Sequence, residues 1–120
     1  MNRKEFLEWV KREYGAEPDF PWSDNNAVLR HRENKKWFAL LMDVGRNKLG
    51  LPGEGTVEAL NIKCDPILID SLRTQPGFHP AYHMSKEKWI TLRLDGTIPD
   101  DQIQALTHLS YQLTNTKSRK

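Results

Sequence analysis

The chain has 120 residues, 38% of them hydrophobic, which suffices for one domain with a core. Its mean hydropathy is -0.71, and its longest apolar run, Trp37 to Met42, is far shorter than the ~20 residues of a transmembrane helix, so we expect no membrane span. The formal net charge of +2 excludes the strongly basic balance of many nucleic-acid-binding proteins, so electrostatic binding would depend on where the charges lie.

The first predicted element is a helix over residues 2–14. Phe6, Val10 and Tyr14 recur every four residues and form an apolar stripe, while charged side chains fill the opposite face. Asn2 and Glu5 have the spacing of a capping box, which marks the start of a helix. Because this amphipathic pattern begins without the apolar core of a signal peptide, we expect a cytoplasmic protein.

A β-hairpin with a basic tip is predicted next. Prolines and asparagines between residues 18 and 26 break regular structure, and Trp22 in this stretch is expected to pack as an edge-strand residue. Residues 27–32 then alternate apolar and basic side chains, and Trp37 to Val44 is apolar enough for a central strand. The cations on or beside the intervening turn are Arg30, Arg32, Lys35 and Lys36.

Residues 45–55 predict a flexible, glycine-rich connection that carries Arg46 and Lys48. This connection lacks the Lys and Ser/Thr that complete a phosphate-binding loop. A strand is predicted over Thr56 to Lys63. A short helix to about residue 73 should begin at Asp65-Pro66, because a carboxylate N-cap there precedes a proline at the first helical position.

The C-terminal third predicts a loop, a strand and a long helix. In the strand from Trp89 to Leu94, alternation places Thr91 and Arg93 outward. The last helix begins at Pro99-Asp100-Asp101, whose negative charges suit the positive end of the helix dipole. The tail beyond about residue 116 should fray. The apolar side chains expected to face inward are Ile90, Leu92, Leu94, Ile103, Leu106, Leu109 and Leu113, with the small Ser110 among them.

This order of elements predicts an α+β fold, with a mainly antiparallel sheet and both long helices packed on one face. No repeat, linker or low-complexity segment divides the chain, so we expect one domain over residues 1–120. No catalytic motif is present, so we expect a non-enzymatic protein that needs no cofactor.

The histidine and cysteine positions give little support to a metal site. His79 and His83 have the four-residue spacing of helical metal ligands, but Pro80 between them disfavours a helix, so we expect no metal site. The single cysteine, Cys64, excludes an internal disulfide, and we expect a structural, partly buried thiol. A reactive thiol would need nearby positive charge to lower its pKa.

Two surfaces carry the candidate functional residues. The first consists of the hairpin cations together with Arg46 and Lys48, which would neutralise phosphates and release counterions. The alternative is that these are solvated charges that protect a sheet edge. On the second surface, aromatic and cationic groups would stack a base or bind a protein partner, unless the aromatics fill the gap between the sheet and the last helix. That surface comprises Tyr82, His83, Lys86, Lys88 and Trp89.

The segment from Pro80 to Trp89, followed by Ser110-Tyr111, resembles the sequence pattern of the MmcQ/YjbR family of small bacterial proteins. Three further pieces match in the same order: Pro21-Trp22, the stretch from Lys36 to Leu40, and the step from Leu60 to Pro66. The resemblance therefore covers most of the chain.

The resemblance implies a frataxin-like (CyaY-like) fold and a role in binding DNA through two adjacent basic projections, a double wing. Here the projections would be the hairpin tip and residues 45–55, with Lys86 and Lys88 as helpers. Because phosphate contacts carry no base information, we expect weak, sequence-independent binding of double-stranded DNA. Two alternatives stay open: a protein-interaction or regulatory module that uses the surface from Tyr82 to Trp89, and a frataxin-like metal binder. The second is disfavoured because lysine and arginine side chains are mixed with the acids of the first helix.

Overall fold

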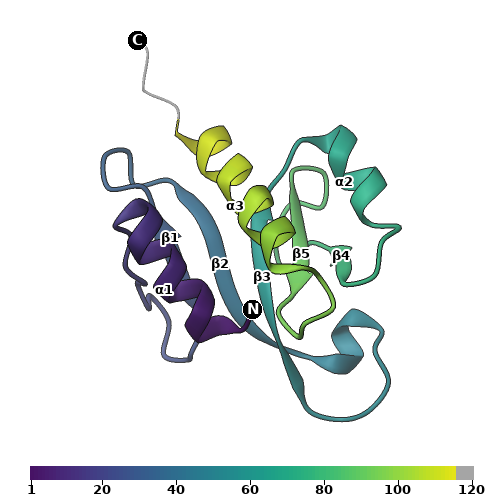
Figure 1. The fold of residues 1–120 in the computed structure, drawn as a ribbon. Helices are drawn as coiled ribbons and strands as arrows, with labels where there is room; N and C mark the ends of the chain where they lie inside the picture. Colours follow the sequence, from purple (N-terminus) through teal and green to yellow (C-terminus); the bar gives the residue numbers. More distant parts are fainter. Residues whose placement is uncertain (116–120) are drawn as a thin grey trace.

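The computed structural model describes residues 1–115 and is built around one five-stranded antiparallel sheet (Figure 1). The strands are β1 (Ala27–Arg30), β2 (Trp37–Gly45), β3 (Thr56–Lys63), β4 (Phe78–Pro80) and β5 (Trp89–Arg93), in the order β1-β2-β3-β5-β4. The helices are α1 (Arg3–Tyr14), α2 (Pro66–Leu72) and α3 (Asp100–Thr114), with a short 3-10 helix, η1 (Arg46–Leu49). The predicted α+β class is confirmed, whereas the frataxin-like fold stays a prediction. The predicted fraying tail, about residues 116–120, lies outside the described residues.

Helix α1 forms where the sequence predicts it, because its first turn has the expected cap. The Glu5 N–H donates to Asn2 Oδ1 at 2.8 Å, and the Asn2 N–H donates to Glu5 Oε1 at 2.9 Å. Gly15 ends the helix in the left-handed conformation with φ of 65°, which a glycine adopts without strain. Within residues 1–115, none of the helices combines the length and apolar character that crossing a bilayer requires.

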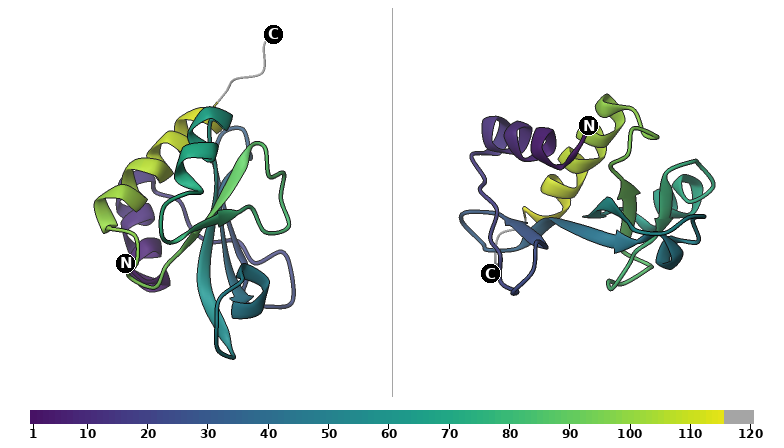
Figure 2. Two further views of the ribbon diagram at one scale, coloured as in Figure 1. Left: turned by 90° about the vertical axis from the view of Figure 1, so that its right-hand side faces the viewer. Right: turned by 90° about the horizontal axis from the view of Figure 1, so that it is seen from below.

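Helices α1 and α3 cover the same face of the sheet, as predicted (Figure 2). Their apolar stripes and the strand residues beneath them form the main core, and the predicted inward-facing residues of β5 belong to it. Helix α2 begins after the Asp65 carboxylate, which accepts a hydrogen bond from the Ile67 N–H at 2.9 Å. Large side chains of the main core include Phe6, Phe38, Leu41, Leu60, Ile62, Ile90, Leu92 and Ile103.

Ser110 joins α3 directly to two strands. Its Oγ donates to the Phe38 carbonyl at 2.7 Å and accepts from the Lys63 N–H at 2.9 Å. The β2–β3 ladder ends at the pair Ala39 and Ile62. The hydroxyl therefore supplies hydrogen bonds to the next carbonyl of β2 and the next N–H of β3, which the ladder leaves unpaired. A small hydroxyl side chain at this position therefore fixes the distance between α3 and the sheet.

The buried face of α3 differs from the prediction. Leu109 and Leu113 are 41% and 42% exposed, so their assignment to the core is wrong. The helix instead buries Ile103, Leu106, Thr107, Ser110 and Thr114, which follow the helical period more closely. Threonines are tolerated there because their hydroxyls bond to carbonyls four residues back, as from Thr107 to Ile103 and from Thr114 to Ser110.

The second face of the sheet is also covered, which overturns the predicted orientation of Thr91. Thr91 is fully buried, not exposed, because the chain between β4 and β5 folds over this face. A smaller core lies here, with Val28, Leu40 and Met42 at its centre. Its cover consists of partly buried side chains from three segments: Trp37 of β2, Leu49 of η1, and Tyr82 and Met84 of the connection between β4 and β5.

Two other segments differ from the prediction. Residues 78–80, predicted as part of a loop, form β4 and pair with β5. Trp22 lies in no strand; it is 42% exposed and packs against Trp37 instead. The segment that precedes Trp22 contacts the sheet edge through a single bridge, between Asp19 and Val28. Prolines on either side of Asp19 prevent a longer ladder.

Candidate functional site

The β1–β2 hairpin and the chain that follows α1 enclose a hollow of about 510 Å³, which we call the hairpin hollow. Its charged lining residues are Arg30, Arg32, Lys35, Glu17 and Asp19. The structure thus brings three of the predicted cations together, and it also sets two carboxylates among them. Lys36, on the same turn, is exposed to solvent.

Arg30 is held in place from two sides. Its Nη2 lies 2.9 Å from Asp19 Oδ2, and its guanidinium carbon lies 6.0 Å from the centre of the Trp37 ring. The ion pair and the cation–π contact fix the direction of the guanidinium. The more exposed Arg32 and Lys35 complete the basic wall of the hollow.

The hairpin tip is docked on α3 and does not project freely, which corrects the expectation that it forms a projecting wing. His31 is buried, and its Nε2 lies 2.7 Å from Thr114 Oγ1 while its ring packs against Tyr111. Asn34 adds a hydrogen bond from its Nδ2 to the Thr114 carbonyl at 3.0 Å. Burial lowers the pKa of His31, because a charged imidazolium would lose its hydration there.

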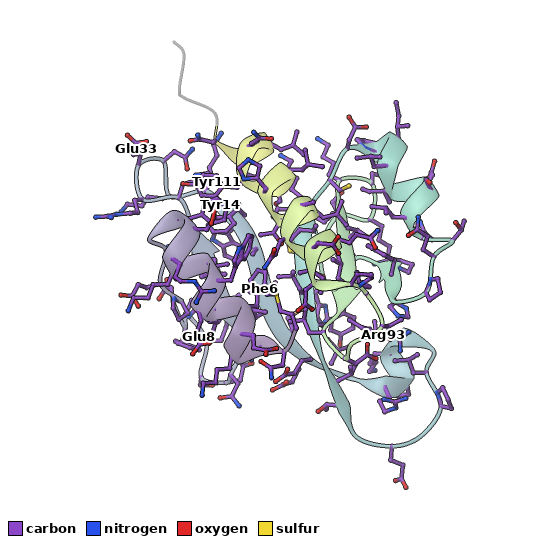
Figure 3. The ribbon with its side chains drawn as sticks, viewed as in Figure 1. Phe6, Glu8, Tyr14, Glu33, Arg93 and Tyr111 are labelled. Atoms are coloured by element: carbon purple, nitrogen blue, oxygen red, sulfur yellow. The ribbon has the colours of Figure 1, made fainter. Side chains whose placement is uncertain are left out.

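An aromatic stack between α1 and α3 supports this docking (Figure 3). The Tyr14 and Tyr111 rings stack with their centres 4.1 Å apart, and the Tyr14 hydroxyl lies 2.8 Å from His108 Nδ1. Burial, with Glu13 and Tyr111 nearby, raises the pKa of Tyr14 to about 12, so this hydroxyl stays protonated. The stack gives a packing role to Tyr111, which with Ser110 is part of the sequence pattern described above.

Arg46 and Lys48 do not lie beside the hairpin tip, so the predicted pair of adjacent wings is wrong. Successive connections of an antiparallel sheet leave from opposite ends (Figure 1). Strand β2 has nine residues, and the eight steps between its first and last residue separate the two connections by roughly 26 Å at ~3.3 Å per step. The second connection is also partly ordered, because η1 forms within it and Arg46 Nε donates to the Pro52 carbonyl at 2.7 Å.

Lys86 and Lys88 lie on the connection between β4 and β5 and help to line other hollows. Lys86 and Lys48 share one of about 260 Å³ with His79 and Tyr82, and Lys86 Nζ donates to the Ala81 carbonyl at 2.9 Å. Lys88 lines a third hollow beside α2. The eight predicted cations are therefore spread over several regions of the surface, and three of them share the hairpin hollow.

A buried pair of polar side chains holds the segment that contains Tyr82 and His83. Asn61 Nδ2 donates to the Tyr82 carbonyl at 2.9 Å, and the Tyr82 N–H donates to Thr91 Oγ1 at 3.0 Å. Thr91 Oγ1 also donates to Asn61 Oδ1, and both residues are fully buried. Sequence reasoning missed this clamp, although Asn61 in the middle of an apolar strand is a signal for it.

The clamped segment forms one wall of a further hollow of about 420 Å³, which we call the tryptophan hollow. Trp22 and Trp37 line it with ring centres 5.9 Å apart and planes at 88°. His83, in a left-handed conformation with φ of 62°, stands at its rim. The remaining lining residues are Asp24, Asn26, Leu40, Met42 and Met84.

The predicted partner surface is thereby divided. Tyr82 packs on the second face of the sheet and Trp89 is partly buried beside Lys63, whereas His83 is exposed. Trp22, which is predicted to pack at a sheet edge, lines the tryptophan hollow opposite the wall that carries His83. The aromatic part of the candidate site is therefore assembled from two distant segments.

The remaining reactive side chains are less accessible. Cys64 is buried, and burial raises the pKa of its thiol, so it is a poor nucleophile. Burial and the nearby Arg93 charge lower the pKa of His79. In residues 1–115, no three His, Cys, Asp or Glu side chains come together as metal ligands.

Similar proteins are found among curated sequences. YyaQ of Bacillus subtilis (strain 168) is 44% identical over 116 residues, which cover 95% of this chain and 98% of YyaQ. YjbR of Escherichia coli (strain K12) is 42% identical over 55 residues, which cover 45% of this chain and 47% of YjbR.

Solved structures are similar as well. A crystal structure of a Pseudomonas syringae protein superimposes with a TM-score of 0.94 at 44% identity, over 96% of this chain and 100% of that one. A Deinococcus radiodurans crystal structure gives a TM-score of 0.75 at 26% identity, over 100% of this chain and 83% of that one. Residues 12–113 also match the sequence model of the YjbR family. Since this match spans α2, the whole sheet and all but the last residue of α3, the chain belongs to the YjbR family.

Proposed function

We propose that the protein is a non-enzymatic nucleic-acid-binding protein that holds DNA phosphates with the β1–β2 hairpin. The observation that carries this proposal is the convergence of Arg30, Arg32 and Lys35 on one open hollow. Guanidinium and ammonium groups that share a concave surface attract phosphate, and each contact releases condensed counterions.

The docked hairpin makes this site suitable for binding, because little conformational entropy is lost when a ligand arrives. His31 and Asn34 hold the tip on α3, and Asp19 holds Arg30. The two carboxylates in the hollow reduce its net positive charge. We therefore expect weak binding, through the backbone and without sequence preference.

The test is a titration of labelled duplex DNA with the protein at low salt, in which fluorescence anisotropy measures binding. Arg32→Ala with Lys35→Ala should weaken binding at least about fivefold, because two phosphate contacts are lost. A matched control, Lys48→Ala with Arg73→Ala, removes the same charge from exposed positions away from the hollow and should bind like the parent. Equal loss in both double variants would mean that net charge, not the hairpin, governs binding.

A protein-interaction module is the second candidate. It is favoured by the apolar tryptophan hollow, where half-exposed Trp22 and exposed His83 face solvent. Backbone amide signals separate the candidates. Duplex DNA at low salt should shift the signals of residues 30–36. If DNA shifts no signal of the parent protein, the DNA-binding proposal fails and the protein-interaction candidate replaces it.

A further inference from the structure

The hairpin hollow and the tryptophan hollow meet at one pair of side chains. Arg30 lines the first, Trp37 lines the second, and the two residues are cross-strand partners in the β1–β2 ladder. The Arg30 guanidinium carbon lies 6.0 Å from the centre of the Trp37 ring. A nucleic-acid strand with a phosphate in the first hollow would therefore have its neighbouring base close to the second.

The apolar walls of the tryptophan hollow suit a flat aromatic group. Trp22 is 42% exposed although it is the largest type of side chain, and its ring is perpendicular to that of Trp37. Leu40, Met42 and Met84 supply further apolar lining. A base stacked on an aromatic side chain gains roughly 5- to 150-fold in affinity.

The polar groups at the rim favour a base over a phosphate. Asp24 is held by the Asn26 N–H, which donates to its Oδ1 at 2.9 Å, and its negative charge repels phosphate. A carboxylate accepts hydrogen bonds from the amino groups of bases, such as N4 of cytosine. Among residues 1–115, no lysine or arginine lines this hollow, so its charge pattern is opposite to that of the hairpin hollow.

The wall that carries His83 is fixed before any ligand arrives. The buried Asn61–Thr91 pair holds the Tyr82 backbone on both sides, and the Tyr82 and His83 ring centres lie 3.9 Å apart. His83 also keeps a left-handed backbone, which costs free energy in a residue other than glycine. This wall of the hollow is thus shaped by the fold and does not need to form around a ligand.

We propose that the tryptophan hollow holds one unpaired nucleobase, so that the protein prefers single-stranded DNA to duplex DNA. This inference rests on the proposed phosphate binding by the hairpin. In a duplex both faces of each base are covered by stacking, whereas a single strand can place one base on Trp22 and its phosphate beside Arg30.

The experiment compares labelled oligonucleotides by fluorescence anisotropy at low salt and pH 8. Single-stranded oligo-dC should bind about tenfold or more tightly than a duplex of the same length, a preference in the range of one stacked base. Trp22→Ala should remove this preference and leave the weaker duplex binding unchanged, whereas Trp22→Phe, which keeps a ring, should retain most of it. The matched control is Phe20→Ala, because Phe20 is 50% exposed but lies outside both hollows.

A second measurement tests the polar rim. Oligo-dC should bind more tightly than oligo-dT, because the 4-amino group of cytosine donates to Asp24 and thymine has a carbonyl there. Asp24→Ala should reduce this difference. In the parent protein, oligo-dC should also shift the indole N–H signals of Trp22 and Trp37 and leave those of Trp9 and Trp89 unchanged.

The outcomes separate this inference from the proposed function. If Trp22→Ala binds oligo-dC like the parent while Arg32→Ala with Lys35→Ala weakens binding, the base site is overturned and the hairpin function stands. If the hairpin double variant binds like the parent, both proposals fail. Equal loss of single-strand and duplex affinity in Trp22→Ala would make Trp22 a structural support of the hairpin and would also overturn the base site.

Discussion

A single hydroxyl group, that of Ser110, joins α3 to β2 and β3. Ser110→Ala would leave the buried Phe38 carbonyl and Lys63 N–H without partners, so the free energy of unfolding should fall by roughly 2–4 kcal/mol. Urea denaturation measures this change. Ser71→Ala, at an exposed position of α2, should stay within about 0.5 kcal/mol of the parent. Equal midpoints for Ser110→Ala and the parent would show that water replaces the lost hydroxyl.

Lys35 combines a cationic side chain with an unfavourable backbone conformation. Its φ is 64°, a value that costs steric free energy for residues with a Cβ atom but not for glycine. Lys35→Gly should therefore leave stability unchanged or raise it by up to about 1 kcal/mol, while it weakens DNA binding through the lost charge. Urea denaturation and anisotropy on the same variant test both. Parallel losses in stability and in binding would contradict this separation.

At the scale of elements, two leucines test which faces are buried. Leu92 on β5 is fully buried, so Leu92→Ala should cost about 2–5 kcal/mol of unfolding free energy. Leu113 on α3 is 42% exposed, and Leu113→Ala should cost less than about 1 kcal/mol. Thermal or urea denaturation of the two variants measures the difference. A large loss for Leu113→Ala would mean that this side chain is covered, for example by a second molecule.

The sequence predicted elements well where local signals are strong. The capping box at Asn2, the Asp65-Pro66 helix start and the strand from Thr56 to Lys63 all lie where expected. The errors arose where tertiary packing decides the outcome. Leu109 and Leu113 have the apolar character of core residues, but α3 turns its threonines and Ser110 toward the sheet because their hydroxyls find backbone partners.

The candidate site was predictable only in part. The hairpin cations are close in sequence, so their clustering could be foreseen, whereas the separation of Arg46 and Lys48 follows from the alternating ends of an antiparallel sheet. Periodicity could not show that the chain between β4 and β5 returns over the second face and buries Thr91. The contact between Trp22 and Trp37 likewise depends on how the chain before β1 runs, which no local pattern encodes.

At the scale of the whole molecule, the buried His31 and the partly buried His79 should make stability depend on pH. The pKa values of His31 and His79 are lowered from 6.5, mainly by burial. In the unfolded chain these groups bind protons at a higher pH than in the folded state, so stability is full above pH 6.5 and falls as the pH drops below it.

Asp95 titrates in a different window. Although its burial opposes ionisation, hydrogen bonds from Thr97 and the Arg93 charge lower its pKa below 3.8, so its contribution is lost only at more acidic pH. Urea denaturation between about pH 7.5 and pH 5 therefore isolates the histidines. His31→Gln with His79→Gln should flatten the profile in this range, and an unchanged profile would show that other groups cause it.

The distribution of charge over the molecule leads to the last prediction. The net charge of +2 gives little long-range attraction, so the proposed DNA binding should depend on the three cations that share the hairpin hollow. Contacts with three or four duplex phosphates imply a log–log salt slope of about −2.7 to −3.6. Arg32→Ala with Lys35→Ala should reduce the size of this slope by up to about 1.8, whereas Lys48→Ala with Arg73→Ala should leave it unchanged. Anisotropy titrations at several salt concentrations measure the slope. The same slope in the parent and the hairpin variant would remove the hairpin from the binding site, whatever the affinities. Binding with fewer phosphate contacts must release fewer counterions and so give a smaller slope.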